Sequence, residues 1–244
     1  MALNKSKYDL MKKLLTLVLL MSMASCAELQ NLKLPNIGTG LSVEEIGGGL
    51  KEALNNGISK GSDLLSQLDG YYKSPYKIFL PAEVTKVTDK LKVIPGFSDA
   101  EEKLTLRVNR AAELAAQKAK PIFVKAIKEM TFRDATNILM GADTAATGYL
   151  REKTFQSLYS EFQPIVLNAL NEVHAADYWE TAVTAYNKIP LVKKTNPKLD
   201  DYATNEALKG LFNMIAKEEI GIRKDISLRT TDLLKKVFAK QDRK

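Results

Sequence analysis

The sequence predicts a single all-α domain of about eight helices, spanning residues 42–244. Apolar residues recur at every third or fourth position over most of this stretch, which is the period of a helix with one buried face. Capping motifs, prolines and glycines divide the pattern into segments of helical length. Strand patterns do not alternate with these segments and no internal repeat is found, so the helices are expected to pack directly on one another.

The first helix is expected to start at the capping-box pattern Ser42-Val43-Glu44-Glu45. Its buried face is predicted to consist of Ile46, Leu50, Leu54 and Ile58. Five glycines within 47–61 weaken it, since each interior glycine costs about 0.5–1 kcal/mol relative to alanine. We therefore expect close backbone packing or a hinge. Lys60-Gly61-Ser62 has the wrong residue order for a phosphate-binding loop.

A turn is expected at Asp69-Gly70, followed by the only short strand candidate in the chain, Tyr76 to Leu80. Because one strand does not make a sheet, the sequence allows at most a minor strand there. Pro81 then suits the first turn of a helix that carries Val84 and stops at Pro95-Gly96.

Two more helix starts are marked in the middle of the chain. Ser98-Asp99-Ala100-Glu101 is a capping-box pattern that opens an alanine-rich helix, and Pro121 is expected to end or kink it. Thr131 is predicted to cap a further helix with Asp134 in its first turn, and Gly141 to stop it.

The second half predicts a long helix from Asp143 with a kink at Pro164, a shorter helix from Tyr178 to Tyr186, and a loop over Ile189 to Asn196. The face of the long helix is predicted to contain Leu158, Phe162, Ile165, Ala169 and Val173. Asp200 to Tyr202 leads into another helix, and Leu233 to Phe238 forms the last amphipathic segment.

The first 25 residues are expected to be a signal peptide that is removed. Lysines precede the apolar run Leu14 to Met21, and small residues lead up to Cys26. This run is too short to cross a bilayer, which takes roughly 20 residues. Met23-Ala24-Ser25-Cys26 resembles a bacterial lipobox, so Cys26 is predicted to carry lipid; the alternative is a plain secretory signal. Met11 is a second candidate start.

Residues 26–41 are predicted to form a lipid-anchored tether, because they contain Pro35, Gly38 and Gly40 and lack a helical period. Localisation follows from the anchor: the bacterial cell envelope, facing the periplasm. The second position after the cut is Ala27, not the aspartate that retains enteric lipoproteins in the inner membrane, which favours the outer membrane.

Charge and composition limit the classes of binding partner that are expected. Removal of residues 1–25 takes away four lysines and one aspartate, which lowers the formal net charge from +7 to +4. No zinc-finger spacing or concentrated basic stripe is present, so nucleic acid is not expected. The expected partners are the membrane, through the lipid on Cys26, and an envelope protein, lipid or cell-wall component.

The chain contains one histidine, His174, and one cysteine, so a multi-histidine metal site is excluded and no cofactor is expected. His174 follows a helical pattern and is expected to interact with the helix end. Polar groups set among small or apolar residues form either a polar pocket between helices or a network of ion pairs in the core. They are Asn109, Arg110, Glu113, Asp134, Thr147, Tyr149, Glu219 and Arg223. Arg110 is expected to be largely buried, with Glu113, Asp134 or Glu219 as its partner.

Several short sequence motifs, taken together in their order along the chain, resemble the bacterial domain-of-unknown-function 4197 family. The resemblance runs from about Leu41 to Phe238. The motifs include Gly49-Leu50-Lys51-Glu52-Ala53-Leu54, Asn109-Arg110-Ala111-Ala112-Glu113, Ala207-Leu208-Lys209-Gly210-Leu211-Phe212 and Arg229-Thr230-Thr231-Asp232-Leu233-Leu234. The resemblance implies an exported, often lipid-anchored helical protein of Gram-negative bacteria, and it carries over no catalytic role.

These observations predict a non-enzymatic envelope lipoprotein that binds or supports another envelope component. The alternative is a hydrolase-type enzyme with an Asp/Glu/Tyr/Arg site between helices, which would need convergent acids and a raised carboxyl pKa.

Overall fold

The computed structural model describes residues 40–82, 84–86, 98–172 and 198–243, with scattered positions between 176 and 196. The chain divides into two compact units, Met1–Val43 and Glu44–Lys244, and the fold described below is that of the second. The predicted signal peptide, Cys26 and nearly all of the tether lie outside the described residues. So do His174 and most of the helix predicted from Tyr178 to Tyr186.

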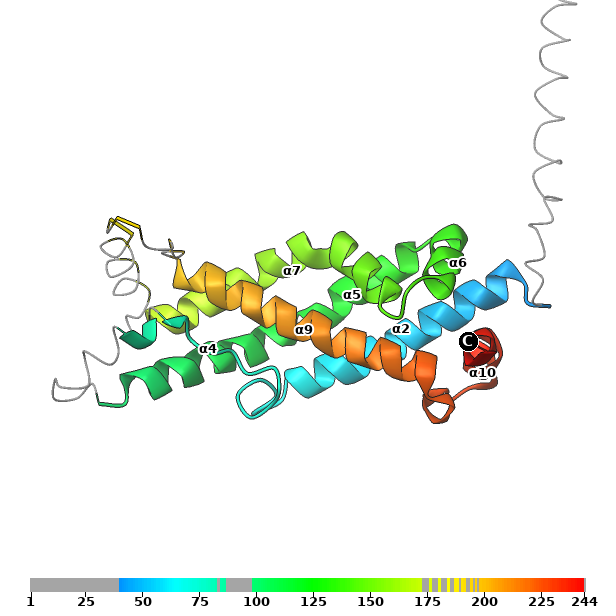
Figure 1. Cartoon of the computed structure of the whole chain (residues 1–244), viewed down its shortest axis with the longest axis horizontal. Coiled ribbons are helices and arrows are strands. Elements are labelled where there is room, and N and C mark those ends of the chain that lie inside the picture. The colour runs from blue at the N-terminus through cyan, green and yellow to red at the C-terminus, as the bar shows by residue number, and fades with distance from the viewer. Residues whose placement is uncertain are drawn as a thin grey trace, which may run out of the picture. The chain divides into compact units, whose positions relative to one another are not determined.

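The second unit is all-α, as the sequence predicts, and the described residues contain no strand. Figure 1 shows the helices along the chain. Their bounds are α2 Val43–Leu65, α4 Ala100–Ala116, α5 Ala119–Glu129, α6 Phe132–Met140, α7 Ala145–Asn171, α9 Leu199–Lys224 and α10 Asp232–Phe238, with short 3₁₀ turns η2 at Ile226–Leu228 and η3 at Ala239–Arg243.

Helix α7 packs against α4, α5, α6 and α9 (Figure 1). It runs antiparallel to α9: Ala146 at its start bonds Glu219 near the end of α9, and Gln163 in its second half bonds Asp200 at the start of α9. Its buried stripe is Leu150, Thr154, Leu158, Phe162, Val166 and Leu170. The predicted face was therefore wrong in part: Leu158 and Phe162 are buried, but Ile165 and Ala169 are partly exposed. The buried stripe keeps a spacing of four residues from Leu150 to Leu170, also across Pro164. The predicted face shifted by one residue after Phe162 and therefore followed the neighbouring stripe.

Close packing accounts for the glycines of α2. A Cβ on Gly49 would lie 2.6 Å from Cγ2 of Val237 in α10, and one on Gly47 would lie 2.7 Å from a ring carbon of Phe132 in α6. Further along α2, a Cβ on Gly61 would lie 3.3 Å from Met214 of α9. The loss of helix propensity at these positions is offset by the close approach of neighbouring helices.

The capping box predicted at Thr131 holds, but the one predicted at Ser98 does not. Thr131 caps α6 with a complete capping box, and Gly141 ends that helix. At α4, by contrast, the N-cap residue is Asp99 and not Ser98, the first residue of the predicted capping box. The Asp99 side chain makes no capping hydrogen bond and instead pairs with Lys103, at 3.0 Å. Pro121 is the third residue of α5, so the break between α4 and α5 falls just before it.

Residues 77–81 have no regular secondary structure, so the strand candidate from Tyr76 to Leu80 does not form a strand. Pro81 precedes a helical stretch that includes Val84, which is buried. The rest of that predicted helix, 87–97, lies outside the described residues.

Candidate functional site

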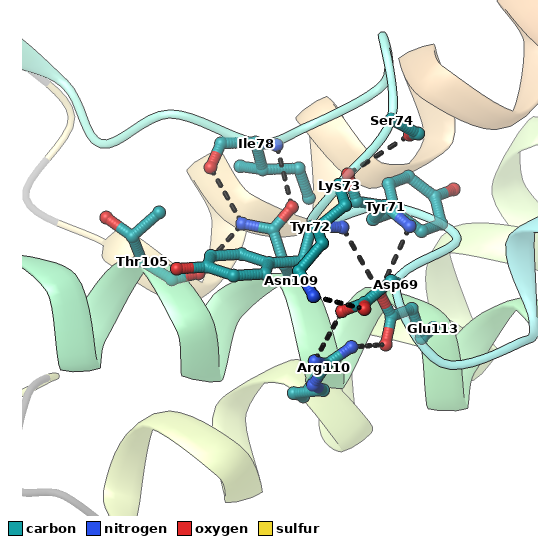
Figure 2. A network of polar contacts seen from close by, with 10 residues as sticks. All are labelled: Asp69, Tyr71, Tyr72, Lys73, Ser74, Ile78, Thr105, Asn109, Arg110 and Glu113. Atoms are coloured by element: carbon teal, nitrogen blue, oxygen red, sulfur yellow. Dashed lines mark hydrogen bonds and ion pairs between the residues drawn. The ribbon is translucent and has the colours of Figure 1, made fainter.

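Three residues of α4 hold the loop that follows α2. We call the set Asp69, Asn109, Arg110 and Glu113 the loop clamp. Figure 2 shows the three α4 side chains reaching from the helix to the loop. They occupy one face because their spacing, i, i+1 and i+4, returns to the same side after one turn.

Glu113 is the buried anchor of the loop clamp, with a side chain only 6% exposed. Its Oε1 accepts hydrogen bonds from the backbone N–H groups of Tyr71, at 3.1 Å, and Tyr72, at 3.2 Å. Its Oε2 accepts a bond of 2.6 Å from Arg110. One carboxylate thus satisfies two loop N–H groups that would otherwise be unpaired near the core.

Arg110 joins Glu113 to Asp69. Its second terminal nitrogen lies 2.6 Å from Oδ1 of Asp69, while Lys73 lies 2.9 Å from the other oxygen of the same carboxylate. A hydrogen bond from Lys73, and a second one from Arg110, hold the pKa of the Asp69 carboxyl below its usual range; the bond from Lys73 has the larger effect. Glu113, Asp134 and Glu219 were the candidate partners of Arg110, and the one that pairs with it is Glu113. Its side chain is 31% exposed, so the expectation of a largely buried guanidinium was wrong.

The backbone at Asp69 turns sharply, with φ at +69°. Asp is among the few residues that tolerate this left-handed conformation. The next residue is Gly70, where a Cβ would collide with the carbonyl oxygen of Leu64. The sequence Asp69-Gly70 therefore meets two local requirements, and the turn carries the Asp69 carboxylate to Arg110.

Asn109 replaces the strand partner that the segment near Ile78 lacks. Its Oδ1 accepts from the N–H of Ile78 at 2.8 Å, and its Nδ2 donates to the Ile78 carbonyl at 2.9 Å (Figure 2). A side-chain amide reproduces both bonds of a backbone pair. The segment is consequently fixed to α4 without a sheet.

Tyr71 fastens the loop to the opposite side of the core. Its ring is fully buried, and its hydroxyl donates a bond of 2.7 Å to the Ala207 carbonyl in α9. The ring fits beside Gly210, where a Cβ would lie 2.9 Å away. Burial raises the pKa of the Tyr71 hydroxyl, and the negative charge of Glu113 raises it further. The hydroxyl therefore stays protonated.

A second polar set lies at the other end of α9. We call Glu219 and Arg223 the cap pair; their side chains are 5% and 2% exposed. Glu219 accepts from the N–H groups of Ala146, at 2.9 Å, and Thr147, at 2.8 Å, and also from the Thr147 hydroxyl, at 2.7 Å. It thereby caps the N-terminus of α7, where a negative charge is favoured.

Arg223 completes the cap pair at the end of α6. It donates to the carbonyls of Ile138, at 2.9 Å, and Leu139, at 3.1 Å, and to Glu219, at 3.0 Å. The cavity beside the pair has a volume of about 10 Å³, room for no more than about one water molecule. The pair therefore ties the α6–α7 connection to α9 and leaves no room for a ligand in that cavity.

A fourth buried charged side chain, that of Arg229, lies after α9. It donates to the carbonyls of Ile222 and Arg223 and forms two bonds, of 2.7 and 2.8 Å, with Asp242. This arginine ends α9 and fastens η3 to it. The spacing of four residues between Asp225 and Arg229 marks this arginine in the sequence, but its carboxylate partner is Asp242, whose spacing of 13 residues has no helical signature.

The remaining two candidates, Asp134 and Tyr149, line an open groove between α5, α6 and α7. The groove has room for about 350 Å³, and Lys125, Glu129 and Lys153 also face it. Hydrogen bonds from the Thr131 side chain and backbone lower the pKa of Asp134. Desolvation raises the pKa of Tyr149. A hydrogen bond from Lys153 to Glu152 raises the pKa of Lys153. At neutral pH these groups offer one carboxylate, one hydroxyl donor and one ammonium.

The eight candidate residues thus fall into three separate sets of contacts. Asn109, Arg110 and Glu113 belong to the loop clamp. Thr147 bonds to the cap pair of Glu219 and Arg223, and Asp134 and Tyr149 line the groove. Within the described ranges, no three His, Cys, Asp or Glu side chains are placed to hold a metal ion. No helix among the described residues is long and apolar enough to cross a membrane.

The fold and its polar sets define a helical bundle in which charged side chains fasten connections to helices. A family model described as "Protein of unknown function (DUF4197)" matches residues 40–239. The chain belongs to this family. No curated protein and no solved structure matches the chain.

Proposed function

We propose that the protein is a bacterial envelope lipoprotein, anchored through Cys26 and facing the periplasm, whose helical domain is a non-enzymatic binding module. The observation that carries the anchor is the order of residues before Cys26: lysines, a short apolar run, then Met23-Ala24-Ser25. Ala27 at the second mature position favours the outer membrane over the inner one.

The geometry of the domain supports binding over catalysis. Glu113, Glu219 and Arg223 are bonded to backbone groups of connections between helices, as expected of structural charges. The surroundings of Asp69, Asp134, Asp225 and Asp242 shift the pKa of each carboxyl group, and in each case the pKa is lowered. A general acid needs the opposite shift.

The rival, a hydrolase-type site, would have to use the groove with Asp134 and Tyr149. Those two groups and Lys153 all have pKa values moved away from neutrality, in the direction that weakens proton transfer. The groove therefore suits contact with a polar partner better than acid–base chemistry.

The anchor is tested on protein purified from the membrane fraction of the native bacterium. Intact mass should show a chain that starts at Cys26 and carries acyl groups. The Cys26→Ala variant should lose the acyl mass and leave the membrane fraction that the wild type occupies. An unmodified mature chain in the soluble periplasm would overturn the proposal.

A further inference from the structure

We propose that the loop after α2 docks onto an anionic phospholipid bilayer through Tyr72, Lys73, Lys77 and Phe79, which we call the docking surface. The inference rests on the proposed function, because the lipid on Cys26 would bring this surface to the membrane. It adds a second contact with the bilayer, made by the folded domain itself.

The first observation is exposed apolar area in a well-fixed loop. The side chain of Phe79 is 67% exposed, and that of Leu68, in the same loop, is 76% exposed. The loop cannot bury them by collapsing, because Glu113 and Asn109 hold its backbone on one side and Tyr71 on the other. A rigid loop that displays apolar groups loses little conformational entropy on binding.

The second observation is the alternation of cations and aromatic rings. The ammonium of Lys77 lies 4.5 Å from the centre of the Tyr72 ring and 5.6 Å from that of Phe79. The guanidinium of Arg110 lies 5.6 Å from the same Tyr72 ring, and Lys73 pairs with Asp69 beside it. No described carboxylate forms an ion pair with Lys77, so its charge is available to an anion.

This combination fits a membrane interface. Aromatic rings with one polar end settle at the headgroup level, and lysines beside them attract anionic headgroups. A phosphate-bearing headgroup could meet Lys73 and Lys77 while Phe79 enters the acyl boundary. A protein partner would need a matching acidic, apolar surface, whereas an anionic bilayer offers both properties next to the predicted anchor.

The length of chain before the domain permits this contact. Residues 27–41 reach at most about 50 Å when extended. Helix α2, with 23 residues, is about 35 Å long, and the docking surface follows its C-terminal end. The tether is therefore long enough for the far end of α2 to reach the bilayer that holds Cys26.

The experiment uses the mature protein from the envelope, whose intact mass is recorded first, so a failure of acylation is seen separately. The protein is added to vesicles of phosphatidylcholine alone or of phosphatidylcholine and phosphatidylglycerol in equal parts. A water-soluble amine-acetylating reagent then reports the exposure of each lysine by peptide mass. If the protein is not acylated, co-sedimentation with the same vesicles measures the surface by itself.

We expect Lys73 and Lys77 to be acetylated at least about fivefold more slowly on the anionic vesicles, a factor that corresponds to the usual contribution of one lysine near such a surface. Lys224 and Lys235 serve as internal controls, because both are exposed and lie at the C-terminal end of α9 and in α10, away from the loop. Higher salt should reduce the difference. Equal labelling of Lys73 and Lys77 on both kinds of vesicle would overturn the proposal.

Matched variants separate this surface from net charge. Anionic vesicles should slow hydrogen exchange at the backbone amides of residues 72–74 and 76–80 of the wild type, and Lys73→Glu with Lys77→Glu should abolish this protection. Lys224→Glu with Lys235→Glu makes the same change in charge and should keep the protection. Phe79→Ser, at an exposed position, should weaken protection without altering circular dichroism. Protection that needs an added envelope protein, or that survives in the first variant, would refute the lipid assignment.

Discussion

The loop clamp and the cap pair use the same device at different depths. Each places a glutamate and an arginine on one helix face, three residues apart in α4 and four apart in α9, and each glutamate accepts two backbone N–H groups of a neighbouring segment. Arg223 gives its remaining bonds to backbone carbonyls, whereas Arg110 turns to a second carboxylate at the surface. The buried arginine thus bonds backbone groups in the core, and the partly exposed arginine bonds a carboxylate at the edge of an exposed loop.

The largest effect should come from breaking the cap pair. Arg223→Ala would leave Glu219 buried without its cation and free two carbonyls of α6, so we expect a loss of about 3–5 kcal/mol in the free energy of unfolding. Urea denaturation measures it. Addition of Glu219→Ala should cost much less than its single effect, because the two residues act together. Fully additive losses would show that the pair is not a unit.

A smaller effect is expected at the loop clamp. Arg110→Ala removes two short ionic bonds, but water reaches the partly exposed site, so we expect a loss of about 1–2 kcal/mol. The same denaturation series compares it with Arg223→Ala. A loss as large as that of Arg223 would mean that exposure does not distinguish the two regions.

The smallest effect is the pH dependence of the clamp. Because the pKa of Asp69 is lower in the folded chain, its contribution is present above the unfolded value of about 3.9 and is lost as the pH falls through the folded value. Thermal unfolding measured from pH 7 downward should therefore show a loss below about pH 4. Asp69→Asn should reduce that loss; an unchanged acid limb would remove Asp69 from the clamp's electrostatics.

Local patterns made much of the fold predictable. Apolar periodicity located the helices, and the Thr131 motif specified both the start of α6 and its cap. The spacing of Glu219 and Arg223 placed them on one face, where they form an ion pair. These features depend on residues within one or two helical turns of each other.

The remaining features depend on partners far apart in sequence. Nothing near Arg110 points to Asp69, 41 residues earlier, and nothing near Glu219 points to the start of α7, 73 residues earlier. The strand candidate failed for the same reason, because the partner of Ile78 is the side chain of Asn109 in α4 and not another strand. Periodicity identifies a buried face but not what lies against it.

The glycines of α2 have a consequence for the order in which the chain folds. With five glycines, α2 is a poor helix by itself, since each costs about 0.5–1 kcal/mol relative to alanine. The groups that fit against it include Met214 and Val237, near the other end of the sequence. Loop closure over such a distance comes late, so the first helix of the domain has to wait for the last ones before it becomes stable. A nascent chain cannot complete this domain until nearly all of it has been delivered.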